Sequence, residues 1–108
     1  GQETFKFAVT AICRDCKEIL ERNGLTFDDI AYIVPHQANQ RIIDFASTKL
    51  KVPKEKFYLN IHKYGNTSSA SIPIALDELN WAGKLHRGDL LLLPACGGLA
   101  SACCLVRW

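Results

Sequence analysis

The sequence has no hydrophobic run long enough to cross a lipid bilayer. Its longest apolar stretch covers residues 90–95, whereas a membrane-spanning helix needs roughly 20 such residues. The first residues, Gly1-Gln2-Glu3, do not resemble the start of a signal peptide. We therefore expect a soluble, cytoplasmic protein with no membrane partner.

The sequence also lacks a strong excess of charge of either sign. Its formal net charge is +2, and a nucleic-acid partner would call for a strongly basic face. Internal repeats, low-complexity stretches and linkers are absent, and hydrophobic residues make up 48% of the 108 residues. This composition is that of a globular protein, and the length allows one domain with one core.

The cysteines lack the even number and loop positions of a secreted disulfide scaffold. Cys13 and Cys16 have C-x-x-C spacing, which makes metal or redox chemistry an alternative. No second pair with zinc-site spacing follows, both residues lie inside a helical pattern, and no strand precedes them. We therefore expect reduced thiols, mostly packed in the core, and no metal site. The five cysteines are Cys13, Cys16, Cys96, Cys103 and Cys104.

Apolar residues at three- and four-residue spacing predict helices. The predicted helices cover residues 4–22, residues 39–51 and a third segment through residues 74–79. Gly24 and Gly83 follow the first and third helix as C-cap residues, and Pro53 stops the second. Thr26 and Asp29 resemble a capping box with Asp in place of Glu or Gln, which predicts a short turn before the next apolar run.

Short apolar runs between the helices predict strands. They cover residues 30–34, 57–61, 90–95 and 102–107. Alternating helices and strands indicate an α/β fold with a mixed, mostly parallel sheet and helices on both of its faces. The last strand should be antiparallel, because only the short turn at Gly97-Gly98 precedes it.

Three polar or glycine-rich segments follow the predicted strands. Ligands of open α/β sheets gather outside the carboxyl ends of the strands, so these segments are the candidate site. His36 follows Pro35, which pins its backbone, but a structural histidine is an equal alternative. Asn66 by itself is typical of a turn or helix cap. The spacing at Gly98 favours a tight turn over the alternative, a backbone N–H that approaches a ligand as in an oxyanion hole.

Three blocks of sequence, in this order and spacing, resemble one known family. They read VPHQANQRI over residues 34–42, YGNTSSASIPIALDE over residues 64–78 and PACGGLASACCLVRW over residues 94–108. Each resembles part of the C-terminal half of β-ketoacyl-[acyl-carrier-protein] synthase III, and FKFAV over residues 5–9 is similar to the helix start that precedes them. The resemblance implies the C-terminal half of a thiolase-like fold.

The resemblance also implies an activity and roles for individual residues. The family condenses acyl-CoA with malonyl-acyl-carrier-protein, with loss of carbon dioxide, in the initiation of fatty acid biosynthesis. By resemblance, His36 and Asn66 bind the malonyl thioester carbonyl as the His and Asn of a Cys-His-Asn triad. Their N–H groups would stabilise the enolate oxygen without a metal or cofactor. Gly98 would supply an oxyanion-hole N–H for the acyl carbonyl.

The segment after His36 is implied to contact the acyl carrier protein. It consists of Gln37, Ala38, Asn39, Gln40 and Arg41. Arg41 is the residue best suited to the acidic surface or phosphate of that partner. The lysines that follow, Lys49, Lys51, Lys54 and Lys56, have an ordinary solvated face as their alternative interpretation. The family implies a homodimer of the full-length enzyme.

The chain departs from the family in several places. Leu99 follows Gly98 where a third glycine is usual, and Cys96 replaces a common Phe, which suggests filler rather than a nucleophile. No segment resembles the surroundings of the nucleophilic cysteine. We therefore expect residues 1–108 to be one domain, the C-terminal part of a longer synthase whose first half and opening strand are missing.

A missing opening strand, expected in the middle of the sheet, has a structural consequence. Residues 30–34 and 90–95 would have to pair directly or recruit a strand from another chain, because buried strand edges cannot stay unpaired.

Two other functions remain open from the sequence. The chain could be a noncatalytic module that binds the carrier protein, since without the cysteine the isolated fragment should be inactive. It could also belong to a secondary-metabolite, polyketide-type condensing enzyme. Asn66 favours priming from acyl-CoA, because other chain-elongating synthases resemble a Cys-His-His pattern.

Overall fold

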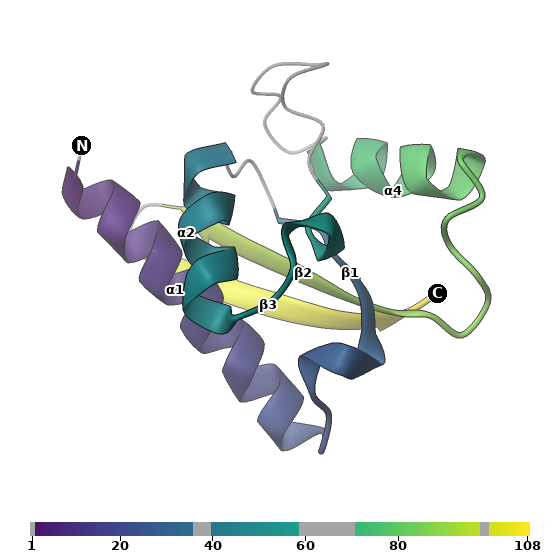
Figure 1. Cartoon of the computed structure of the whole chain (residues 1–108), viewed down its shortest axis with the longest axis horizontal. Helices are drawn as coiled ribbons and strands as arrows, with labels where there is room; N and C mark the ends of the chain where they lie inside the picture. The colour runs from purple at the N-terminus through teal and green to yellow at the C-terminus, as the bar shows by residue number, and fades with distance from the viewer. Residues whose placement is uncertain (1, 36–39, 59–70, 98–99) are drawn as a thin grey trace.

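A β-sheet covered by helices on both faces forms the centre of the molecule (Figure 1). The computed structural model describes residues 2–35, 40–58, 71–97 and 100–108. The helices are α1 (Gln2–Arg22), α2 (Gln40–Leu50) and α4 (Ser71–Trp81), with short 3-10 turns η1 (Phe27–Asp29) and η2 (Lys54–Lys56). The strands are β1 (Ile30–Ile33), β2 (Leu90–Gly97) and β3 (Ala100–Arg107).

The sheet has the order β1-β2-β3 among the described residues. β1 pairs with β2 in parallel, with Ile30 opposite Leu90 and Ile33 opposite Leu92. β3 returns antiparallel to β2, with Gly97 opposite Ala100. The predicted mixed sheet with an antiparallel last strand is therefore confirmed, and the two long strands extend further toward the glycine turn than predicted.

β1 and β2 pair directly, which is the first of the two arrangements expected without an opening strand. The backbone N–H of Val34 donates to the carbonyl of Leu92 at 2.8 Å and continues the ladder past the end of β1. No strand can lie between two strands that share their hydrogen bonds. The middle of the sheet is therefore closed, and a further strand could join only at an edge.

The strand predicted over residues 57–61 is reduced to a single bridge in the described part of the chain. Phe57 forms an isolated parallel bridge with Ile33, and the N–H of Tyr58 donates to the Ile33 carbonyl at 2.9 Å. The turn η2, which follows Pro53, occupies the residues just before the bridge. Residues 59–61 lie outside the described residues.

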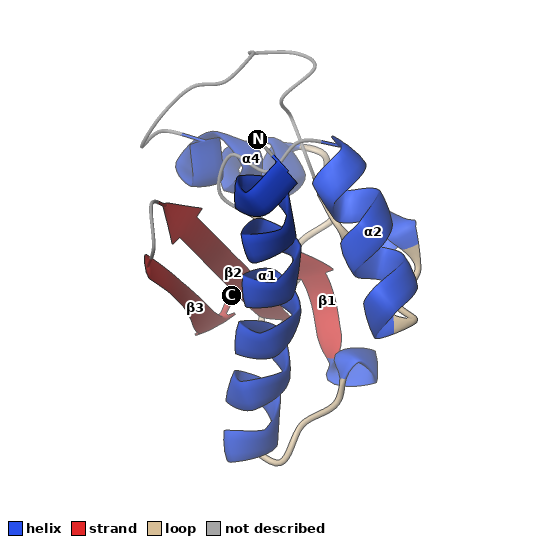
Figure 2. Cartoon of the chain, turned by 90° about the vertical axis from the view of Figure 1, so that its left-hand side faces the viewer, coloured by secondary structure: helices blue, strands red, loops and turns tan. Residues whose placement is uncertain are grey.

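The alternating residues of β2 pack against helices on opposite faces of the sheet. Leu92 lies in the core with Ile12 and Cys16 of α1 and Ile43 of α2, and Figure 2 shows α1 and α2 on one side of the strands. Leu91 lies in a second cluster with Leu79 of α4. This double burial explains why the run over residues 90–95 has no polar alternation.

The three helices of the described residues end in the same hydrogen-bonded turn. The N–H of Leu25 donates to Leu20 O at 2.9 Å, that of Val52 to Ser47 O at 3.0 Å, and that of Lys84 to Leu79 O at 3.0 Å. A bond from an N–H to the carbonyl five positions earlier is typical of the Schellman motif. This motif needs a left-handed backbone at the residue just before the N–H donor. That residue is Gly24 with φ 65°, Gly83 with φ 72° and, after α2, Lys51 with φ 58°.

The predicted capping box is also present. The Asp29 carboxylate accepts the backbone N–H of Thr26 at 2.9 Å, and the N–H of Asp29 donates to Thr26 O at 3.0 Å. These bonds close η1 and direct the chain into β1. Within the described residues, no helix has both the length and the apolar character required to traverse a membrane.

Candidate functional site

The segments that carry the predicted site begin at one edge of the sheet. β1 and β2 are parallel, and Phe57 bridges Ile33 in parallel, so the chain leaves all three at their carboxyl ends. His36, Gln37, Ala38, Asn39, Asn66 and Gly98 themselves lie outside the described residues. The last described residues before these positions, Pro35, Tyr58 and Gly97, all lie where the chain leaves the carboxyl end of a strand or bridge, as a ligand site of an α/β sheet requires.

The residues just before His36 are held firmly in the core. Val34 is fully buried, bonds to Leu92 through its N–H, and is followed by Pro35, which is also buried. The chain therefore leaves the sheet at a fixed point, as expected from the proline. The role of His36 itself stays a prediction.

Arg41 is one of two predicted carrier-binding residues that the structure describes. It lies in the first turn of α2, and its guanidinium carbon is 4.6 Å from the centre of the Phe5 ring of α1. The rings of Phe5 and Phe45 pack edge to face, with their centres 5.3 Å apart. The contact between the cation and the ring face holds the long Arg41 side chain at the junction of the two helices.

Gln40, the other described residue of that segment, makes a bond within α2. Its side-chain N–H donates to an Asp44 carboxylate oxygen at 2.9 Å. Lys54 lies 3.4 Å from the same oxygen. The hydrogen bond from Gln40 lowers the pKa of Asp44, and Lys54 acts in the same direction. Gln40 therefore stabilises the negative charge of Asp44, and its role as a carrier contact stays a prediction.

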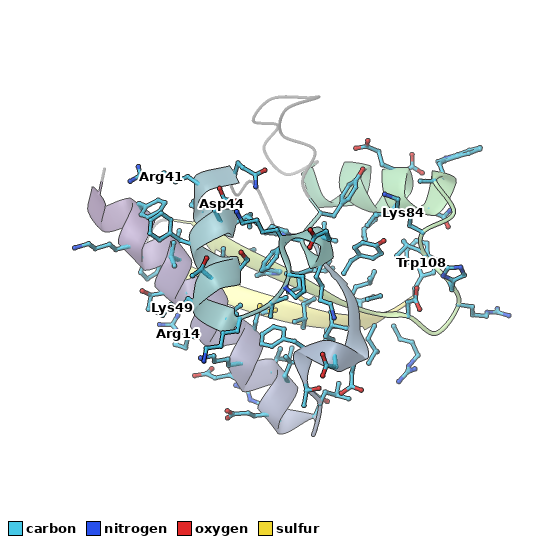
Figure 3. The ribbon with its side chains drawn as sticks, in the orientation of Figure 1. Arg14, Arg41, Asp44, Lys49, Lys84 and Trp108 are labelled. Atoms are coloured by element: carbon cyan, nitrogen blue, oxygen red, sulfur yellow. The ribbon has the colours of Figure 1, made fainter. Side chains whose placement is uncertain are left out.

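These side chains border a groove of about 760 Å³ between α1 and α2. Its cationic residues are Lys6, Arg41, Lys49 and Lys54, and its acidic residue is Asp44. Figure 3 shows Arg41, Asp44 and Lys49 along α2. The remaining lining residues are Phe5, Val9, Thr10, Phe45 and Thr48. We call this feature the α1–α2 groove.

Sequence reasoning missed the contribution of α1 to this groove. Phe5 lies on the apolar stripe of the helix, so its spacing predicts a core residue. Nothing in the sequence indicates that its ring lies beneath Arg41. Of the lysines near Arg41, for which an ordinary solvated face is the alternative interpretation, Lys49 and Lys54 line the groove. Lys51 and Lys56 are not among the lining residues.

The thiols of Cys13, Cys16, Cys103 and Cys104 are free. Cys13 and Cys16 lie inside α1 and are buried, as predicted. Cys16 contacts Cys103 of β3, with the two sulfur atoms 3.9 Å apart. Among the described residues, His, Cys, Asp and Glu side chains form no cluster of three or more suited to a metal ion. The side chain of Cys96 lies outside the described residues.

Solved structures with this arrangement are thiolase-like condensing enzymes. The 3-oxoacyl-[acyl-carrier-protein] synthase III of Aquifex aeolicus superposes with a TM-score of 0.93 at 49% identity, covering 100% of this chain and 35% of that one. The priming β-ketosynthase of the R1128 polyketide pathway superposes with a TM-score of 0.84 at 37% identity, over 99% of this chain and 33% of that one.

Sequence relatives narrow this class to one family. The β-ketoacyl-[acyl-carrier-protein] synthase III of Clostridium novyi is 52% identical over the whole chain, which spans 34% of its length. Residues 20–108 match the family described as 3-oxoacyl-[acyl-carrier-protein] synthase III C terminal. The chain belongs to this family. It spans about a third of the length of the curated relatives that it matches.

Proposed function

We propose that this chain forms the C-terminal part of an acyltransferase that initiates fatty acid biosynthesis. The full enzyme would condense acyl-CoA with malonyl-acyl-carrier-protein to 3-oxoacyl-acyl-carrier-protein and carbon dioxide. The 52% identity with the synthase of Clostridium novyi over the whole chain is the observation that carries the proposal. The common edge from which the three candidate segments leave the sheet supports it.

In this proposal the chain stabilises negative charge on the substrate. A cysteine in the first half of the enzyme accepts the acyl group from acyl-CoA and releases CoA. Malonyl-acyl-carrier-protein then loses carbon dioxide, and the resulting enolate attacks the acyl-cysteine carbonyl. His36 and Asn66 donate hydrogen bonds to the enolate oxygen, and the N–H of Gly98 donates to the oxygen of the acyl carbonyl. These donors need no metal or cofactor for the step.

The α1–α2 groove is the docking surface for the carrier protein in this proposal. Arg41, Lys6 and Lys49 give the groove a cationic rim, while Asp44 is paired with Lys54. A cationic rim around Phe5 and the half-exposed Phe45 suits an acidic protein that delivers a phosphate and an aliphatic arm. We include a homodimer of the full-length protein and a location in the cytoplasm in the proposal.

A second candidate is a condensing enzyme of polyketide biosynthesis. The 37% identity with the R1128 priming β-ketosynthase favours it. The two candidates share the chemistry and differ in the carrier protein that they accept. A third candidate is a noncatalytic module that binds the carrier protein. This candidate requires that the full-length protein lack a cysteine nucleophile.

The proposal is tested with the full-length protein that contains this chain. The protein is mixed with an acyl-CoA and malonyl-acyl-carrier-protein, and the carrier is analysed by mass spectrometry for a 3-oxoacyl group. Condensation on the fatty acid carrier supports the proposal, and condensation only on a polyketide carrier indicates the second candidate. A protein that binds the carrier but forms no product is the binding module.

A further inference from the structure

Cys16 and Cys103 form a thiol pair that the proposed chemistry does not use. Cys16 lies in the middle of α1 and is fully buried, whereas Cys103 lies on β3 and is partly exposed. Their sulfur atoms are 3.9 Å apart although the residues are 87 positions apart in the sequence. A disulfide bond is about 2.05 Å long, so the two sulfur atoms would have to approach by about 2 Å.

The interface around the pair holds the two elements in register. The guanidinium of Arg14 donates to the hydroxyl of Ser101 at 2.8 Å. Ser101 and Cys103 are two positions apart on one strand and therefore share a face of the sheet. Cys104 is the next residue along β3, so its side chain lies on the opposite face of the sheet, and it is exposed. The geometry thus directs Cys16 toward Cys103 and away from Cys104.

The two thiols differ in acidity. The hydrogen bond from Cys16 lowers the pKa of Cys103, because it stabilises the thiolate. The same hydrogen bond and burial raise the pKa of Cys16. A thiolate is the form of cysteine that reacts with peroxides. Cys103, which is also the more accessible of the two, is therefore the attacking residue, and Cys16 is the resolving residue.

We propose that Cys16 and Cys103 are an oxidative modification site that forms a reversible disulfide when hydrogen peroxide reaches the protein. The Cys103 thiolate attacks one peroxide oxygen, the O–O bond breaks, and the released hydroxide takes a proton to become water. The Cys16 sulfur then attacks the Cys103 sulfenic acid, the S–O bond breaks as the S–S bond forms, and the departing hydroxyl takes the Cys16 proton to leave as a second water. Two thiols are oxidised and one peroxide is reduced to two waters. The product joins α1 to β3, and a dithiol reductant reverses it.

Peptide mapping of the full-length protein tests this proposal. The protein is treated with hydrogen peroxide, its remaining thiols are alkylated, and it is digested with trypsin without reduction. Cleavage after Arg14, Lys17, Arg87 and Arg107 places Cys16 and Cys103 on separate peptides, residues 15–17 and 88–107, and leaves Cys13 on a third. We expect a cross-linked peptide of residues 15–17 and 88–107, two hydrogen atoms lighter than its parts and absent after reduction.

Variants decide which cysteine of residues 88–107 is joined. The cross-link should persist in Cys104→Ser and disappear in Cys103→Ser. Fragmentation of the cross-linked peptide from the unchanged protein gives the same assignment if Cys103→Ser does not fold. A cross-link that persists without Cys103, a link between Cys13 and Cys16, or thiols that remain reduced at full peroxide exposure would overturn the proposal. None of these outcomes depends on condensing activity.

Discussion

Arg41 is one of the two predicted partner-binding residues whose positions the structure describes. Its guanidinium lies over Phe5 at the rim of the α1–α2 groove. The sequence could predict the residue from its motif, but not the ring beneath it, because Phe5 is 36 positions earlier and reads as core. The motif also predicts Gln40 as a carrier contact, and the sequence did not indicate that its side-chain amide donates a hydrogen bond to Asp44.

Reversal of charge at Arg41 should weaken the carrier protein complex. In Arg41→Glu an anionic side chain would face an acidic partner, and such like-charge contacts cost enough to reduce affinity by about tenfold or more. Lys84→Glu is the control with the same change of charge, since Lys84 lies beside α4, away from Arg41 (Figure 3). Binding is measured with the full-length protein at two salt concentrations. An equal loss of affinity in both variants would contradict the assignment of the α1–α2 groove as the docking surface.

Replacement of Gln40 should change the titration of Asp44. The hydrogen bond from Gln40 is the main reason why the pKa of Asp44 is lowered, so Gln40→Ala should raise that pKa toward the ordinary value. A lowered pKa stabilises the fold above the unfolded-state pKa of about 3.9, and this stabilisation is lost as the pH falls through the folded-state pKa. Carboxyl NMR measures the shift, and an unchanged Asp44 titration would exclude the assigned bond.

At the scale of elements, the sequence predicted helix ends more reliably than strand ends. Gly24 and Gly83 mark the left-handed positions after α1 and α4 directly. The end of α2 was predicted from Pro53, yet the left-handed residue there is Lys51, which no sequence rule singles out. Of the strand predicted over residues 57–61, the structure describes Phe57 and Tyr58, and the bridge from Phe57 to Ile33 joins segments that are far apart in the sequence.

Lys51 allows a direct test of the Schellman turn after α2. A non-glycine residue at φ 58° carries a backbone cost that glycine avoids, so Lys51→Gly should stabilise the protein by about 0.5–1 kcal/mol. Lys49→Gly is the matched control, because it places the same substitution inside α2 and should destabilise by about 1 kcal/mol. Urea denaturation measures both values. A loss of stability in Lys51→Gly would show that the turn does not form as described.

At the scale of the whole molecule, the sequence predicted the layers but not the pairing of the strands. Alternating helices and strands and an unbroken apolar run indicated a sheet buried on both faces. They could not choose between direct pairing of β1 with β2 and recruitment of another strand, because strand order depends on contacts between residues about 60 positions apart. The α1–α2 groove was missed for the same reason.

The family and the fold rest on the whole chain, whereas the catalytic assignment rests on three residues. His36, Asn66 and Gly98 are assigned by resemblance, and all three lie outside the described residues. The buried Val34 and Pro35 and the common edge of the sheet are compatible with the assignment. Decarboxylation of the malonyl group that depends on His36 and Asn66 would distinguish catalytic residues from residues with only a structural role.

Decarboxylation of malonyl-acyl-carrier-protein by the full-length protein is the most direct test of the central claim. Carbon dioxide release is compared among the unchanged protein, His36→Ala, Asn66→Ala and the control His86→Ala, whose side chain is 78% exposed beside Asp89. We predict a loss of about a hundredfold or more in the first two variants, as for removal of an oxyanion donor, and no change in the control. Decarboxylation that is unchanged in His36→Ala and Asn66→Ala would contradict the account.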